Sequence, residues 1–194
     1  MRFDSELVVE KLLEWEQDLL RFRLPAWEEI PDFGLYMDQL IALLAGYLDY
    51  APREGGAETA VTAAAINNYV RMRIMPEPRR KRYYREHIAY LIVICTLKQS
   101  LNIAYVQRIL PTGIPEAEVE AIYRRFVERH SRATTYFIEQ VRLAAEPVLN
   151  RKEEQNVSDV IASAALISRF CKHLAERLIL LEGAAAQEDP GAPD

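Results

Sequence analysis

Two neighbouring groups of polar side chains have the residue types that proteins use to contact nucleic acids. Asn67, Asn68 and Arg71 are spaced to share the outer face of a short helix. An asparagine amide can bond an adenine edge through two hydrogen bonds, and an arginine guanidinium can do the same with guanine. Thr62 and Arg73 stand at the two ends of that helix. Cations that could sit on phosphates follow closely: Arg79, Arg80, Lys81, Arg82 and Arg85.

The charge of the chain is unevenly distributed. The 194 residues carry a net charge of −5, yet residues 59–100 hold eight basic and two acidic side chains, a net charge of +6. The remainder holds 16 basic and 27 acidic side chains, a net charge of −11. Such a separation indicates a basic surface for an anionic partner on an otherwise acidic protein. The alternative is a charged loop that is simply solvated.

Local signals place the first group on a helix and the second on a turn. Thr62 has the side chain of an N-cap, and the residues after it predict a helix over 63–72 with one apolar side. Pro76 and Pro78 cannot continue that helix, because proline lacks the backbone donor. Residues 75–84 are therefore expected to form a turn or a small ribbon with the basic run at its centre.

The segments around this pair complete a known layout. Residues 87–100 are apolar nearly all round, which predicts a helix that is buried on all sides. A helix with one apolar side is predicted over 35–48. A first helix at 35–48, a recognition helix at 63–72 and a basic wing at 76–85 are the parts of a winged helix–turn–helix.

Helical spacing of apolar residues continues through the rest of the chain, which predicts an all-α fold. Two long helices are predicted over 116–146 and 156–181, joined near 147–155 into an antiparallel hairpin. Their apolar seams are longer than one hairpin needs for itself, which favours a homodimer through these C-terminal helices. A short helix at 102–110 precedes them, and residues 51–56 have the composition of a mobile loop.

These elements suggest four segments along the chain. They are an N-terminal helix in 1–23, the winged helix–turn–helix in 24–110, the helical hairpin in 111–182 and a disordered tail in 183–194.

Motifs of catalysis and metal binding are missing from the sequence. It contains no CxxC, HExxH, GxGxxG or Walker pattern. Cys95 and Cys171 fall on apolar faces, which is typical of core positions, and the histidines are scattered. Cys171 and His173 point in different directions on a helix and cannot share a metal. We therefore expect no enzyme activity, no catalytic residues, no metal and no cofactor.

The sequence also favours a soluble, cytoplasmic protein with no membrane partner. Its longest apolar stretch, Ile88 to Leu97, is about half of what a membrane span needs. The first residues carry acids where a signal peptide needs a basic region and an apolar run. Two cysteines in the whole chain do not make a disulfide scaffold, as expected of a reduced compartment.

The stretch from Val61 to Leu110 resembles the DNA-binding domain of MerR-type transcriptional regulators. It reads VTAAAINNYVRMRIMPEPRRKRYYREHIAYLIVICTLKQSLNIAYVQRIL. In MerR-type proteins a recognition helix with a Tyr is followed by a short apolar step, a Pro, a basic wing ending in Tyr and an apolar helix. Asn67 stands where those proteins usually have Arg, and Arg73 where they usually have Gly.

A closer similarity extends from Leu24 to Leu110. The blocks LPAWEEIPDFGLYMDQ and INNYVRMRIMPEPRRKRYYREHIAYLIVICTLKQ are similar to a bacterial family known mainly as a domain of unknown function. Its members are generally named MerR-like or winged-helix regulators. The resemblance implies DNA binding by residues 63–71 and by the wing. Nothing in the chain resembles the metal- or drug-sensing site of MerR-type proteins.

Together these observations predict a transcriptional regulator that reads double-stranded DNA. The helix at 63–72 would enter the major groove and the wing at 76–85 would hold the backbone. The alternative hypothesis is a module in which the same basic face binds an acidic protein or RNA.

Overall fold

The computed structural model describes residues 4–48, 61–149 and 157–181. The loop predicted at 51–56 and the tail predicted at 183–194 lie outside the described residues. The N-terminal part consists of α1 (Ser5–Arg21), the 3₁₀ turn η1 (Trp27–Glu29) and α2 (Met37–Leu48). The middle consists of α3 (Ala63–Arg71), α4 (Arg85–Leu97) and α5 (Ile103–Ile109), and the chain continues through α6 (Glu116–Leu149) and α7 (Val157–Leu180).

The prediction of an all-α fold is confirmed. Within the described ranges, the only β-pairing consists of two isolated bridges, Leu35 with Tyr83 and Arg79 with Arg82. Leu35, which was expected to open the second helix, instead belongs to one of these bridges, and α2 begins at Met37. None of the helices described is both long and apolar enough to cross a bilayer.

Helix α4 is the centre of the core. Every residue from Glu86 to Cys95 is buried, as the apolar sequence on all sides of this helix predicts. Cys95 is buried, which raises the pKa of its thiol to about 12, as is typical of a core cysteine. Helix α2 packs directly on α4, and the apolar faces of α2, α3 and α5 join α4 in one buried cluster, chiefly through Leu40, Leu44, Ile66, Tyr69 and Val106.

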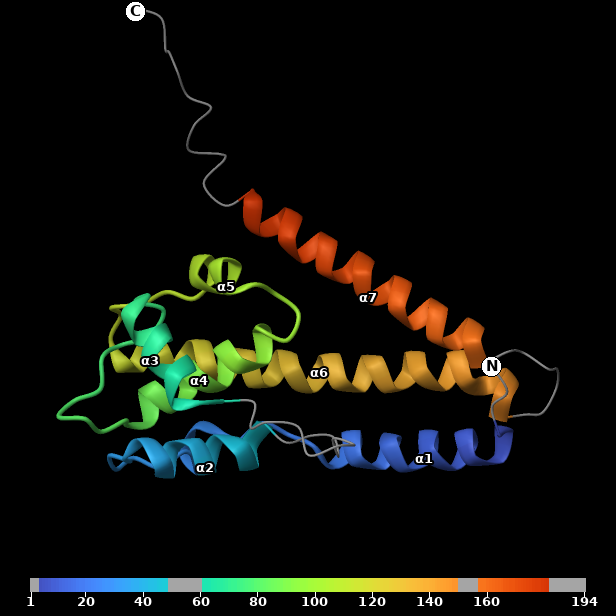
Figure 1. Cartoon of the computed structure of the whole chain (residues 1–194), viewed down its shortest axis with the longest axis horizontal. Helices are drawn as coiled ribbons and strands as arrows, with labels where there is room; N and C mark the ends of the chain where they lie inside the picture. Colours follow the sequence, from blue (N-terminus) through green and yellow to red (C-terminus); the bar gives the residue numbers. More distant parts are fainter. Residues whose placement is uncertain (1–3, 49–60, 150–156, 182–194) are drawn as a thin grey trace, which may run out of the picture.

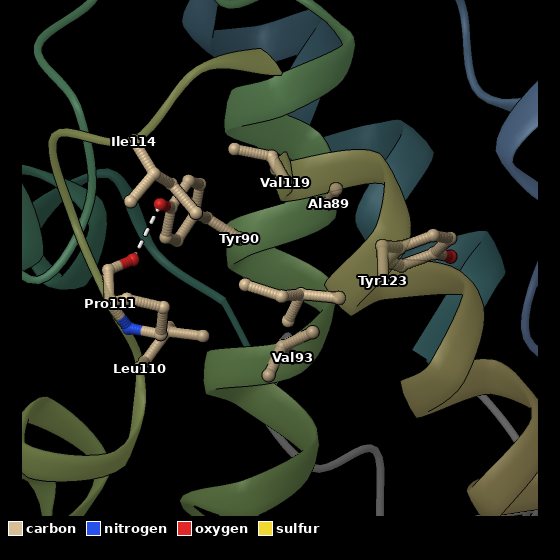
Figure 2. Close-up of a pocket in the computed structure, with 9 residues that line it drawn as sticks. Ala89, Tyr90, Val93, Leu110, Pro111, Ile114, Val119 and Tyr123 are labelled. Atoms are coloured by element: carbon tan, nitrogen blue, oxygen red, sulfur yellow. Dashed lines mark hydrogen bonds between the residues drawn. The ribbon is translucent and has the colours of Figure 1, made fainter. Parts of the chain in front are cut away.

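The start of α6 belongs to the same packed unit as α4. Figure 2 shows the segment around Pro111 and the first turns of α6 folded against one side of α4. The Tyr90 hydroxyl donates a hydrogen bond to the Pro111 carbonyl oxygen at 2.6 Å (Figure 2). Tyr123, which is 1 % exposed, donates from its hydroxyl to the Pro25 carbonyl oxygen at 2.8 Å. These contacts extend the core past α5, so the first three turns of α6 belong to it.

Helix α6 packs along α1 and not along α7. Figure 1 shows α1 and α6 side by side over the length of α1. The rings of Trp15 and Phe137 meet edge to face at 5.6 Å, and Glu16 pairs with Arg142 on the same seam. The seam expected to face the second long helix is therefore occupied mainly by α1 and α4. The helix also continues through Pro147, where the sequence predicted a connecting loop.

Helix α7 runs back from the end of α6 but diverges from it (Figure 1). Among the described side chains of α7, Ile179 is the buried one. Cys171 is exposed, so its predicted core position is wrong. The physical reason is that no other described part of the chain covers the apolar stripe of α7. Large side chains on it are more than half exposed: Ile161, Leu166, Ile167, Phe170, Leu174, Leu178, Leu180 and Leu181.

Candidate nucleic-acid interface

Helix α3 is oriented by a cap and a buried face. The Thr62 hydroxyl oxygen accepts a hydrogen bond from the Ala65 backbone N–H at 3.2 Å, which confirms the predicted N-cap. Ile66 and Tyr69 are buried on the inner side of the helix. Thr62 therefore fixes where the helix starts, and its hydroxyl oxygen is already used for that purpose.

The outer face of α3 carries the predicted base-reading residues. Asn67 and Arg71 are exposed. The Arg71 Nη2 donates to Asn68 Oδ1 at 2.6 Å, and the Asn68 amide nitrogen lies 3.3 Å from the Met72 sulfur. Asn68 thus positions the Arg71 guanidinium along the helix surface, whereas Asn67 presents its amide to solvent.

The end of α3 is marked by a left-handed residue. Arg73 has φ 56°, and the Ile74 N–H returns to the Tyr69 carbonyl oxygen at 3.0 Å. Gln107 from α5 donates to the Met72 carbonyl oxygen at 3.0 Å and holds the same end. The left-handed backbone conformation is strained for any residue that has a Cβ atom. The Arg73 side chain is exposed.

We expect Arg73→Gly to raise the free energy of unfolding by roughly 0.5–1 kcal/mol, because glycine adopts this φ without strain. Arg73→Val should lower it by about 1–2 kcal/mol, since a β-branched side chain tolerates this conformation least. Urea unfolding followed by circular dichroism measures both values. A loss of stability with glycine would show that contacts of the arginine outweigh the backbone strain.

The segment after α3 forms a tight two-residue hairpin. The backbones of Arg79 and Arg82 bond each other in both directions at 3.0 Å. The turn residues Arg80 and Lys81 have φ 49° and 62°, the left-handed pair that a type I′ turn requires. The predicted turn or small ribbon is therefore a hairpin, and Figure 1 shows it at the same end of the molecule as α3.

Two of the predicted phosphate-binding cations are used inside the structure. Arg79 forms an ion pair with Glu86, a buried carboxylate, and its guanidinium lies 5.5 Å from the centre of the Tyr84 ring. Arg85 donates from Nε to the Ile30 carbonyl oxygen at 2.8 Å. These contacts tie the hairpin and the start of α4 to the core, which gives both arginines a positioning role.

Arg82 fastens the hairpin to the segment before α2. Its Nη2 donates to the Tyr36 hydroxyl at 2.7 Å, and the guanidinium lies 4.5 Å from the centre of that ring. Leu35 and Tyr83 exchange backbone hydrogen bonds at 2.8 and 2.9 Å beside it. Gly34 is required at this crossing, since a Cβ there would lie 2.9 Å from the Arg82 Cβ.

The side chains of three predicted cations make no hydrogen bond or ion pair with any described residue. They are Arg73, Arg80 and Lys81, and all three are exposed. Arg80 and Lys81 form the tip of the hairpin, and Arg73 lies between α3 and the hairpin. Their charges are therefore available to an external anion, whereas those of Arg79 and Arg82 are partly satisfied within the molecule.

The region that contains α3 and the hairpin coincides with a defined sequence family. The model of the family described as Domain of unknown function (DUF1836) matches residues 25–126, just over half of the chain. The chain belongs to the DUF1836 family. No curated protein and no solved structure matches it. The matched region runs from Pro25 to Phe126, so it includes the turns of α6 that close the core through Tyr123.

The DUF1836 region contains a positioning residue that the sequence did not single out. His87 is 0 % exposed. Its Nδ1 accepts a hydrogen bond from the Tyr84 backbone N–H at 3.1 Å, so its Nε2 carries the proton and donates to the Glu77 carbonyl oxygen at 3.0 Å. One imidazole thus joins the two arms of the hairpin. The signal for this role in the sequence was a histidine at the start of an apolar helix, after a turn bounded by prolines.

We expect His87→Leu to lower the free energy of unfolding of the DUF1836 region by about 2–4 kcal/mol. Leucine fills a similar volume but leaves the Tyr84 N–H and the Glu77 carbonyl without their side-chain partner in a buried place. His173→Leu, at an exposed position on α7, is the matched control and should cost under about 0.5 kcal/mol. Chemical unfolding measures both. Equal effects of the two changes would contradict the bridging role.

Proposed function

We propose that the protein is a sequence-specific DNA-binding transcriptional regulator, with α3 as its recognition helix and the hairpin as its wing. The observation that carries the proposal is the pairing of two surfaces at one end of the molecule. One is the outer face of α3 with Asn67 and Arg71, and the other is the group of exposed cations Arg73, Arg80 and Lys81. The first can bond base edges, and the second can bind phosphates.

The order and packing of the elements support a winged helix–turn–helix. α2 packs on α4, α3 packs on α2, and the hairpin leads directly from the end of α3 into α4. The left-handed conformation of Arg73 offers a physical reason for the glycine that MerR-type proteins usually have at this point. In this proposal α3 lies in the major groove while Arg80 and Lys81 contact the adjacent backbone.

We infer further that the regulator acts as a homodimer through α7. Val160, Ile167 and Leu174 recur at intervals of seven residues along one side of this helix, and Leu181 continues the spacing directly after its end. The exposed large side chains on α7 form an apolar surface on each copy, and a standard stable interface buries roughly 800 Å² on each partner. An exposed apolar stripe of this length in water is typical of an interaction surface.

A two-fold dimer would match the way such regulators read DNA. Two copies related by a two-fold axis present two α3 helices to two half-sites, so the preferred sequence should be a palindrome. The test starts with selection of duplexes from a random library by the full-length protein. A recurring palindromic sequence is the result expected. Recovery of no preferred duplex would overturn the proposal, and retention of RNA or an acidic protein in its place would favour an interaction module.

Replacing Arg71 or Asn67 with Ala should weaken binding to the selected duplex by about 1–3 kcal/mol per half-site and change binding to a scrambled duplex little. Both side chains are exposed, so their loss should not disturb the core. Asn68→Ala should show a smaller loss of the same kind, because it only frees the Arg71 guanidinium. Competition titrations measure the two affinities.

The control for these variants is Arg129→Ala, which removes one exposed cation from α6 and should leave both affinities within about twofold. If the Arg71 and Asn67 variants weaken binding to both duplexes equally, α3 is not the element that reads the sequence.

A further inference from the structure

A cavity lies on the seam between α1 and α6, away from α3 and the hairpin. It has a volume of about 400 Å³. Its walls come from α1, α6 and the last residue of α2, and its floor is formed where α4 ends. The lining residues are Trp15, Leu19, Phe22, Leu48, Thr96, Gln99, Ser100, His130, Ala133, Thr134 and Phe137. A volume of this size is within the range of small-molecule sites.

The walls of the cavity are aromatic. Trp15 and Phe137 form one edge-to-face pair, with ring centres 5.6 Å apart and planes at 85°. Phe22 and His130 form a second pair at the same separation, with planes at 69°. Flat aromatic molecules pack well against rings that present both edges and faces. The described lining residues include no Asp, Glu, Lys or Arg, so a charged group entering the cavity would lose water without gaining a counter-ion from them.

His130 is a polar group that can orient a molecule in this cavity, and Gln99 and Ser100 line it at the end of α4. His130 is half-buried, and its ring nitrogens have no hydrogen-bond partner in the part of the chain that the structure describes. Burial lowers the pKa of His130, which keeps the imidazole neutral near pH 7, with one donor and one acceptor. The Thr96 and Thr134 hydroxyls donate to the Ile92 and His130 carbonyl oxygens of their own helices, so they can serve only as acceptors.

From these walls and this histidine we propose that the cavity between α1 and α6 is a binding site for an uncharged, flat aromatic molecule that carries a hydrogen-bonding group. The rings of Trp15 and Phe137 hold its aromatic part, and the imidazole of His130 bonds its polar group. The site also contacts α4, the helix that directly follows the hairpin, because Thr96 lines the cavity near the C-terminal end of α4. Any effect of the molecule on DNA affinity rests on the proposed function, whereas its binding does not.

The two tryptophans of the chain make binding measurable at the site itself. Trp15 lines the cavity, while Trp27 is buried elsewhere, beside Tyr123. In a ¹H–¹⁵N spectrum of the full-length protein without DNA, naphthalene-2-carboxamide should shift the Trp15 indole resonance in a saturable way and leave that of Trp27 in place. Naphthalene-2-carboxylate has the same ring system and a negative charge, and it should bind at least about tenfold more weakly.

Two variants separate the cavity from the rest of the surface. Ala133→Phe should fill the cavity and abolish the Trp15 shift, and Ala162→Phe, on exposed α7, should not. His130→Leu keeps the apolar wall and should weaken binding by about five- to tenfold, because the hydrogen bond to the imidazole is removed. An unshifted Trp15 at the solubility limit of the amide, or a shift that survives Ala133→Phe, would overturn the proposal, whatever the protein does with DNA.

Discussion

We expect the affinity of the protein for duplex DNA to fall by about 10³–10⁵ between about 50 and 200 mM salt, although the chain carries a net charge of −5. This salt dependence is expected to come from the basic residues at one end of each copy and not from the net charge of the chain. If a dimer neutralises about 6–10 phosphates through its basic ends, each contact releases a condensed counter-ion, and added salt opposes that release. The acidic remainder of the chain repels DNA and should favour contact through the hairpin end alone. Titration of a labelled duplex at several salt concentrations gives the slope.

Replacing Arg80 and Lys81 with Ala should reduce that slope by about 0.9 for each phosphate that the variant no longer neutralises. These side chains are exposed at the hairpin tip and bond no described residue, so their removal should leave the fold intact. Selected and scrambled duplexes should both bind more weakly and by nearly the same factor, because phosphate contacts carry no sequence information.

The matched control removes two cations from α6, Arg125→Ala with Arg129→Ala, both at exposed positions. It changes the net charge by the same amount, so an equal reduction of the slope would mean that overall charge acts on DNA and not the hairpin. A binding constant that stays flat with salt in the unaltered protein would contradict the electrostatic basis of the proposed interface.

The sequence predicted well the features that depend on neighbours along the chain. The cap at Thr62 and the burial of α4 are local: a hydroxyl placed before a helix, and apolar residues on every side of one. The stop after α3 and the hairpin followed from Pro76 and Pro78, which exclude a continuous helix. Signals of this kind can be recognised without knowledge of the tertiary contacts.

The roles of the basic residues could not be predicted in the same way. Arg82 reaches Tyr36, which lies 46 residues earlier, and Arg85 reaches the backbone of Ile30. A run of four cations in the sequence therefore divides into two that fasten the hairpin and two at its tip. The division depends on tertiary contacts that no local pattern specifies.

The apolar seams of the long helices show a second limit of local reasoning. A heptad-like stripe predicts that a helix has a partner but does not say which one. α1 and α4 supply the partners of α6, and the described part of the chain leaves the stripe of α7 uncovered. The exposed Cys171 is a direct consequence, because the stripe that carries it was expected to lie against α6.

We expect Ile167→Glu with Leu174→Glu to convert the protein to a monomer and to lower its affinity for a two-half-site operator by at least about 100-fold. These residues are 60 % and 61 % exposed in the single chain, so glutamates there meet water unless a second copy covers them. In the dimer they would place four like charges in an apolar interface. A monomer also loses the effective concentration with which one bound half-site holds its partner at the other, typically worth 10²–10⁴ in affinity.

Light scattering on the full-length variant measures its mass, and circular dichroism checks that the helices persist. Binding to a duplex with a single half-site should remain within about threefold of the unaltered protein. The reason is that α3 and the hairpin belong to the core, which α7 contacts near its C-terminal end, at Ile179, and not at the substituted positions. The control, Ala165→Glu with Lys172→Glu, adds the same number of carboxylates at exposed positions on the opposite side of the helix from Ile167 and Leu174 and should stay dimeric. If the Ile167 and Leu174 variant remains a dimer, the two copies meet elsewhere. If it becomes a monomer with undiminished affinity for the full operator, the protein reads DNA one copy at a time.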